Sequence, residues 1–275
     1  MVNNSLQKKK AENTFSGFLT SEGAKKKINE IIGGKNGQRF ITAIVSAVSN
    51  NPMLQECENT TILSGALLGE SLGLSPSPQL GHYYLVPFND RKNNRKVATF
   101  QLGYKGYIQL AMRSGGYKDI DTLEIKEGEY RGRDKNSGKQ IFSFIEDDDE
   151  RESKETIGYM AYFELSNGFF KRIYWTKEKM KTHALQYSQS YKSDIDKGWK
   201  NSFWSKDFDA MSFKTLIRSL ISKWGIMSIE MQGAIEQEID AESKESDYVE
   251  GKETETATVE AEFFDAPNAE EKGDK

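Results

Sequence analysis

An acidic and a basic residue two positions apart are the nearest that the sequence comes to a catalytic pair. Glu124 and Lys126 form the E-x-K pattern of metal-dependent nucleases, on a segment predicted to be a strand. Such an enzyme needs a second carboxylate beside Glu124 to share the metal ion. Asp121 lies three residues away, about 10 Å along a strand and on its opposite face, and Asp90 would have to reach in from a loop. A metal-dependent nuclease is therefore an alternative function and not the favoured one.

Other catalytic patterns are missing from the sequence. It has no G-x-x-x-x-G-K-[ST] phosphate loop, to which residues 33–35 come nearest, and no G-x-S-x-G nucleophile motif. One cysteine, Cys57, and two histidines, His82 and His183, leave too few ligands for a Cys/His zinc site. The acidic run 146–150 offers oxygen ligands to Mg²⁺, although such a run is more often a solvated loop. We expect no enzyme and no required cofactor, and leave Mg²⁺ open as an assisting ion.

Cations interleaved with aromatic side chains give a stronger signal. A groove for single-stranded nucleic acid needs positive charges along the phosphates and flat side chains near the bases. One basic stripe on an amphipathic helix is usually its solvated face, so the coincidence of several stripes carries the prediction. The candidate DNA contacts lie in a polar loop, on two predicted helices and on a hairpin: Arg91, Lys92, Arg95, Lys96, Gln101, Tyr104, Lys105, Arg113, Lys171, Arg172, Lys214 and Arg218.

The charge of the chain is divided unevenly along its 275 residues. Residues 229–275 carry 16 acidic and 4 basic side chains, a net charge of −12, whereas residues 1–228 carry 34 basic and 26 acidic side chains, a net charge of +8. The basic part fits a polyanionic partner. The acidic part either mimics DNA and competes for the groove or docks a partner, and in the first case deleting residues 232–275 raises DNA affinity.

Helices and strands must position these candidate residues. The hydrophobic periodicity predicts an α+β fold with an antiparallel sheet. We expect a Lys-rich, partly helical segment at 1–35, a DNA-binding core at 36–228 and a disordered acidic tail at 229–275. A tight type I′ turn is predicted at Asn167-Gly168. The core helices are expected at 39–57, 59–74, 104–114, 177–187 and 208–224, and the strands at 83–88, 97–102, 122–130, 140–145, 158–165 and 169–175.

The compartment follows from what the sequence lacks. No apolar run approaches the ~20 residues that span a bilayer, and no apolar stretch follows the lysines at positions 8–10 as it would in a signal peptide. We expect a protein of the cytoplasm that does not bind a membrane.

Three ordered motifs resemble those of RecT-type recombinases. The first is 72–74 followed by 80–88, Leu-Gly-His-Tyr-Tyr-Leu-Val-Pro-Phe. The second and most specific is 100–115, Phe-Gln-Leu-Gly-Tyr-Lys-Gly-Tyr-Ile-Gln-Leu-Ala-Met-Arg-Ser-Gly. The third consists of Trp204, Asp207, Met211, Lys214, Thr215 and Arg218. Together they span residues 60–226.

The resemblance implies a phage or prophage recombination protein in a bacterial host. Such proteins bind single-stranded DNA, anneal complementary strands without a nucleotide, assemble into rings or helical filaments on the annealed duplex, and work beside a phage 5′→3′ exonuclease. The implied fold is a curved antiparallel sheet with helices behind a basic groove. Gly103 and Gly106 match signature glycines, which either let the backbone approach phosphates or permit tight helix packing. Trp204 is more plausibly a core residue than a base-stacking one.

A protein that coats single strands without annealing them is a further alternative. Mg²⁺-dependent cleavage separates the nuclease from the annealing protein, and failure to speed strand pairing separates the coating protein. For the annealing protein we expect Lys105→Ala, Arg113→Ala and Arg218→Ala each to weaken DNA binding with the fold intact.

Overall fold

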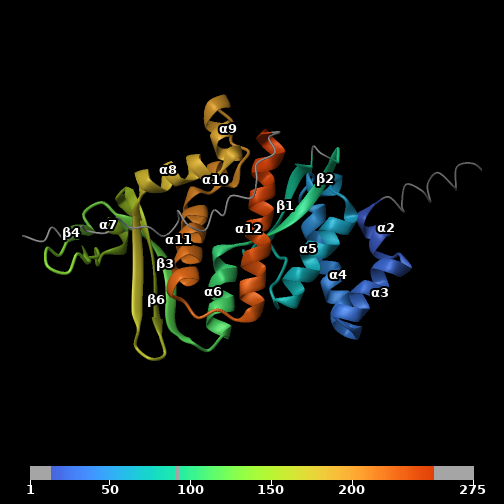
Figure 1. Cartoon of the computed structure of the whole chain (residues 1–275), viewed down its shortest axis with the longest axis horizontal. Coiled ribbons are helices and arrows are strands. Elements are labelled where there is room, and N and C mark those ends of the chain that lie inside the picture. The colour runs from blue at the N-terminus through green and yellow to red at the C-terminus, as the bar shows by residue number, and fades with distance from the viewer. Residues whose placement is uncertain (1–13, 91–92, 251–275) are drawn as a thin grey trace, which may run out of the picture.

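The computed structural model describes residues 14–90 and 93–250, excepting the side chains of residues 34–35 and 240–250 (Figure 1). Its class is α+β with antiparallel sheets and no closed barrel, as the sequence predicts. Figure 1 shows an elongated arrangement, in which N-terminal helices occupy one end and the longest strands the other. Within the described residues, no helix is both long and apolar enough to cross a bilayer.

The N-terminal third of the described chain is helical. Thr14 and Ser21 cap the first two helices through their hydroxyl oxygens, which accept from the amides of Gly17 and Ala24. The second long helix ends three residues earlier than predicted because Gly73 takes a left-handed φ of +62° before the prolines are reached. The elements are α2 (Phe15–Leu19), α3 (Glu22–Ile31), α4 (Gly34–Ser49), the 3₁₀ helix η1 (Leu54–Glu56) and α5 (Asn59–Ser71).

The strands form three separate antiparallel groups. A three-stranded sheet has the order β3-β6-β7, and two hairpins pair β1 with β2 and β4 with β5. Short helices α6 and α7 lie between strands in sequence. The bounds are β1 (Tyr83–Asp90), β2 (Arg95–Leu102), α6 (Tyr104–Arg113), β3 (Tyr117–Lys126), β4 (Tyr130–Arg133), β5 (Gln140–Phe142), α7 (Asp148–Ser153), β6 (Thr156–Leu165) and β7 (Phe170–Thr176).

The tip of the β6–β7 hairpin differs from the prediction. Gly168 has a φ of +84°, but Asn167 is not among the described residues with positive φ. A type I′ turn needs positive φ at both central residues, so the predicted turn type is wrong. The amide of Gly168 donates to the carbonyl of Leu165, which places the only left-handed residue of this turn at its last position.

One apolar core joins the sheet to its helices. Tyr159, Ala161 and Phe163 on β6 are buried against Leu216, Ile217 and Leu220 of α11, because alternate strand residues face the same side. Five described helices follow β7 in sequence, and the first four run up to residue 224. The bounds of these four are α8 (Lys177–Tyr187), α9 (Gln189–Lys197), α10 (Phe203–Lys206) and α11 (Phe208–Trp224), and α8 and α11 match the predicted ranges.

A C-terminal helix occupies the first part of the segment predicted to be disordered. Residues predicted to begin a disordered tail form α12 (Ile229–Glu250). Met231, Ala234, Ile235 and Glu238 recur at helical spacing and are buried. The acidic composition of the segment gave no sign of this buried face, because only three residues of the face are apolar up to residue 239. Residues 251–275 of the predicted tail lie outside the described residues.

Candidate nucleic-acid interface

A cavity of about 580 Å³ opens between the β1–β2 hairpin, helices α8 to α10 and α11. Three large aromatic side chains on its wall remain exposed to solvent: Tyr187 (47%), Trp199 (53%) and Phe203 (40%). Gln101, Lys206, Lys214 and Arg218 supply polar and cationic groups to the same wall. Flat side chains beside cations are the groups that hold bases and phosphates of a single strand.

A buried carboxylate shapes the aromatic side of this cavity. Asp194 accepts hydrogen bonds from the amides of Asn201 (2.9 Å) and Ser202 (2.7 Å) and from the hydroxyl of Ser205 (2.7 Å). Burial raises the pKa of Asp194, but these hydrogen bonds outweigh it and hold the pKa below its usual value. The loop between α9 and α10 is thereby fixed to α9, with Trp199 on it.

Lysines lie over the rings of the exposed aromatic residues. Lys197 Nζ is 4.5 Å from the ring centroid of Trp199, and Lys206 Nζ is 5.9 Å from that of Phe203. Phe203 also contacts Tyr84 of β1, at 6.0 Å between ring centroids. Cation and ring therefore share one surface, on which a phosphate can meet the ammonium while its base meets the ring.

The structure brings part of the predicted set to this cavity. Gln101, Lys214 and Arg218 line it, although they come from β2 and α11, which are more than a hundred residues apart. Lys105 is exposed on α6, and Tyr104 is half-buried against Phe213, at 5.4 Å between ring centroids.

Arg113 is exposed on α6, but its guanidinium is hydrogen-bonded to the end of α5. Its Nη2 donates to the carbonyl of Leu72 (2.5 Å) and its Nη1 to that of Gly73 (3.3 Å), so it satisfies carbonyls at the end of α5. The guanidinium thereby ties α6 to α5.

The described cations at the start of β2 form ion pairs with carboxylates. Arg95 pairs with Asp90 and Glu58, both at 2.9 Å, and Lys96 pairs with Glu56. Hydrogen bonds from Asn93 and Arg95 hold the pKa of Asp90 below its usual value. Arg91 and Lys92 lie outside the described residues.

The two cations of β7 do not line the cavity. Lys171 Nζ lies over the ring of Trp224 at 4.4 Å. Arg172 donates to the carbonyl of Gln140 and lies over the ring of Phe142 at 4.9 Å, which fastens the β4–β5 hairpin to the sheet.

The signature glycines serve close packing. A Cβ on Gly103 would lie 2.1 Å from the carbonyl oxygen of Gly81, and one on Gly106 would lie 2.0 Å from that of His82. These distances are far inside van der Waals contact, so only glycine lets α6 approach this turn. Of the two predicted roles, the structure supports tight packing. Trp204 is buried against Tyr191 and Phe208, as expected of a core residue.

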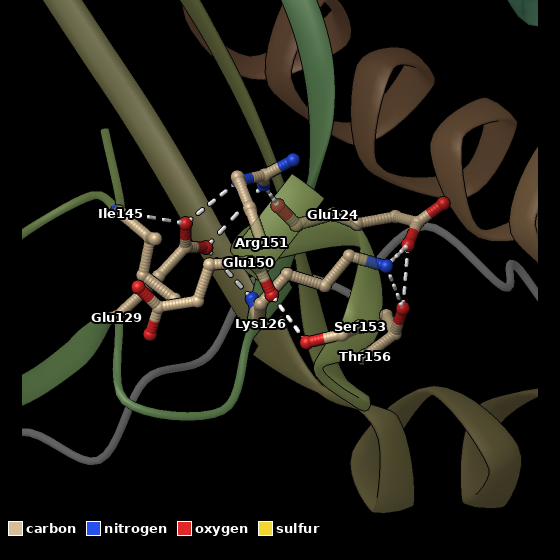
Figure 2. Close-up of polar contacts among 8 residues, drawn as sticks. All are labelled: Glu124, Lys126, Glu129, Ile145, Glu150, Arg151, Ser153 and Thr156. Carbon is tan, nitrogen blue, oxygen red and sulfur yellow. Dashed lines mark hydrogen bonds and ion pairs between the residues drawn. The ribbon is translucent and has the colours of Figure 1, made fainter. Parts of the chain in front are cut away.

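Glu124 and Lys126 form an ion pair with each other. Lys126 Nζ lies 2.5 Å from Glu124 Oε2, and Thr156 Oγ1 donates to the same oxygen at 2.5 Å (Figure 2). Within the described residues, no group of three or more His, Cys, Asp or Glu is arranged to hold a metal ion. The acidic run 146–150 begins a helix instead, since Asp147 caps α7 by accepting from the amide of Glu150 (2.7 Å).

The sequence interpretation missed the aromatic half of this cavity. Tyr187, Trp199 and Phe203 were not among the candidates. Tyr187 ends α8 without a basic stripe beside it in the prediction, and Trp199 and Phe203 lie in a segment whose short helices α9 and α10 were not predicted. A signal was nonetheless present, since segment 188–206 places four lysines among four aromatic residues.

Comparison with known proteins matches this chain to one protein family and to two relatives. The RecT family profile matches residues 38–251, which include the whole lining of the cavity and α12. Uncharacterized protein YqaK of Bacillus subtilis (strain 168) is 39% identical over 245 residues, covering 86% of this chain and 78% of its own length. Protein RecT of Escherichia coli (strain K12) is 26% identical over 200 residues, covering 72% of this chain and 70% of its own length.

Proposed function

The chain belongs to the RecT family, whose members bind and anneal single-stranded DNA in recombination, and we propose that it holds the strand in the cavity between β1, α8–α10 and α11. The observation that carries this proposal is the convergence of Lys214, Arg218 and Gln101 with the exposed rings of Trp199 and Phe203. These groups come from separate elements and face one hollow.

The wall of the cavity suits a strand of any sequence. Cations bind phosphates without reading the bases, and an aromatic ring stacks on every base because each base has a flat face. Base identity is then tested by the second strand through Watson–Crick pairing. The protein would accordingly supply a held strand, and the complementary strand would supply the specificity.

Annealing in this form consumes no nucleotide. The sequence lacks a phosphate loop, and strand pairing is itself downhill once both strands are held extended. We propose an ATP-independent reaction with no residue acting as a catalyst. Chains would line up as a ring or helical filament on the strand and the annealed duplex, each holding a short stretch, which gives cooperativity along the DNA.

The setting is that of phage recombination. A phage 5′→3′ exonuclease would expose the strand, and this protein would load onto it in the cytoplasm of the bacterial host. We propose that annealing requires no cofactor, and Mg²⁺ stays open as an assisting ion.

An annealing assay tests the proposal. Two complementary labelled oligonucleotides are mixed with the protein without ATP, with and without Mg²⁺. Pairing faster than the protein-free control, with both strands intact, supports annealing. Strand shortening that requires Mg²⁺ would instead support the nuclease, and binding without faster pairing would support a coating protein.

A further inference from the structure

Helix α12 brings a buried carboxylate onto one of the cations of the cavity. Glu238 Oε1 lies 2.5 Å from Lys214 Nζ, and Glu238 is fully buried. Tyr107 of α6 donates its hydroxyl hydrogen to the other oxygen, Glu238 Oε2. Lys214 Nζ also lies 3.5 Å from Gln101 Oε1. The ammonium group therefore stands between a carboxylate behind it and the polar wall of the cavity in front of it.

This carboxylate occupies the place of a counterion. A buried ammonium is strongly unfavourable without an anion beside it. Phosphate and carboxylate oxygens serve an ammonium in the same way, as charged hydrogen-bond acceptors. Lys214 can thus be satisfied by Glu238 when the cavity holds no DNA, and by a phosphate when it does.

The pair of Glu238 and Lys214 is one of the contacts that hold α12 on the protein. Up to residue 239 its buried face consists of Met231, Ala234, Ile235 and Glu238, so one position in four is a charge. In Figure 1, α12 runs across the long axis of the molecule, between α6 and the β1–β2 hairpin. A face with so little apolar surface holds a helix weakly. Glu238 favours the docked state only while Lys214 has no other anion.

We propose that Lys214 and Gln101 form a phosphate subsite, which Glu238 fills in the DNA-free protein, and that a phosphate of single-stranded DNA displaces Glu238 and releases residues 229–239 of α12. This inference rests on the proposed function, since it assigns an internal competitor to the same cavity. It also gives the acidic C-terminal segment a defined contact, made by one residue.

Competition of this kind has a measurable signature in the salt dependence. Neutralising a phosphate with Lys214 releases a cation from the DNA in either protein. In the wild-type protein the displaced Glu238 carboxylate takes up a cation and offsets that release, whereas Glu238→Gln has no carboxylate to do so. The slope of log affinity against log salt concentration is therefore expected to steepen by about 0.7, the value for one single-strand phosphate contact.

The test compares Glu238→Gln with Glu236→Gln, an exposed position on the same helix with the same change of net charge. A fluorescein-labelled oligothymidylate is titrated at several salt concentrations. If α12 is docked for about nine-tenths of the time, Glu238→Gln binds about tenfold tighter than wild type at low salt. Glu236→Gln is expected to stay within about twofold of wild type and to keep its slope.

Hydrogen exchange on the wild-type protein supplies a test that needs no variant. With oligothymidylate bound, the amides of residues 231–239 are expected to exchange faster, while those of α11 exchange more slowly. Equal or slower exchange at 231–239, or a Glu238→Gln variant that binds no tighter than Glu236→Gln, would overturn the inference and make Glu238 a permanent partner of Lys214. A wild-type protein that does not bind the oligonucleotide would overturn the proposed function and this inference together.

Discussion

The guanidinium of Arg113, on α6, donates a hydrogen bond of 2.5 Å to the backbone carbonyl of Leu72, just after α5. A second bond reaches the carbonyl of Gly73, and a third the carbonyl of Gln109 within α6. Arg113, which the sequence predicted to be a DNA contact on α6, thus connects α6 to the end of α5. A charged donor that satisfies carbonyls at a helix end acts on stability first.

Arg113→Ala is expected to lower the free energy of unfolding by about 1.5–3 kcal/mol, the range for hydrogen bonds to charged groups. This replaces the expectation that the variant would leave the fold intact. Urea unfolding followed by circular dichroism measures the loss. Lys105→Ala is the matched control, because Lys105 is exposed on the same helix and should change stability by no more than ~0.5 kcal/mol. Unchanged stability in Arg113→Ala together with weaker DNA binding would return Arg113 to the DNA contacts.

Trp199→Ala and Phe203→Ala are each expected to weaken single-strand binding by about 1–3 kcal/mol, the loss measured for a stacking ring. Both rings are largely exposed, so the fold should persist. Fluorescence anisotropy of a labelled oligonucleotide measures the affinity. Ile195→Ala is the control, since Ile195 is an exposed apolar residue of α9 that does not line the cavity. Equal affinity in all three variants would remove the aromatic wall from the binding site.

Gly106→Ala is expected to abolish stable folding or to cost at least ~3 kcal/mol, because its methyl group would overlap the carbonyl of His82. Soluble yield and thermal unfolding are the readouts. Gly23→Ala on α3 is the control, since a Cβ there meets nothing within 4 Å and should stabilise the helix by up to ~1 kcal/mol. A stable Gly106→Ala protein that fails only in DNA binding would favour the phosphate-approach role.

The sequence predicted two of the helices after β7 with the right bounds. Thr176 caps the start of α8 by accepting from the amide of Lys179, and α11 begins at the cap Asp207 and ends before Gly225. Helices α9 and α10 were missed, since nine and four residues are too few for a period to emerge. Helix α12 was not predicted because its buried face includes Glu238, which in the sequence is indistinguishable from the other charges of an acidic tail.

The candidate site could be predicted only in part, because residue type does not show which side chains the fold brings together. Residue type marked Gln101, Lys214 and Arg218, and the fold brought them together. Residue type also marked Arg95, Lys96 and Arg113, but each of these has a hydrogen-bond partner 37 to 41 residues away in the chain. Which carboxylates and carbonyls compete with DNA for a cation depends on tertiary packing, which one sequence does not reveal.

The carboxylate of Glu129 allows a test of how acid changes the free energy of unfolding through the region from β3 to β5. The fully buried carboxylate accepts from Arg151 Nε (2.7 Å) and from the amides of Lys126 (2.7 Å) and Ile145 (3.3 Å) (Figure 2). Burial raises the pKa of Glu129, yet these donors outweigh burial and hold the pKa below its ordinary value of 4.5. Arg151 also donates to the carbonyl of Glu124, so the carboxylate organises the junction of β3 and α7.

The sign of the pH effect follows from that shift. A carboxyl group with a lower pKa in the folded state binds fewer protons there than in the unfolded chain. Its stabilisation is therefore complete above pH 4.5 and is lost as the pH falls through the folded value. Glu129→Gln is expected to cost about 3 kcal/mol near pH 7, because Arg151 loses its anion, and to lose less further stability than wild type when acidified below pH 4.5.

Urea unfolding at pH 7 and at a series of acidic pH values measures both quantities. The matched control is Glu127→Gln, an exposed carboxylate two residues away. It should follow the wild-type curve, because the side chain of Glu127 is exposed and a surface charge contributes little to stability. Parallel acid curves for wild type and Glu129→Gln would mean that the carboxylate is not ionised in the folded protein, and would remove Glu129 as the charged centre of this junction.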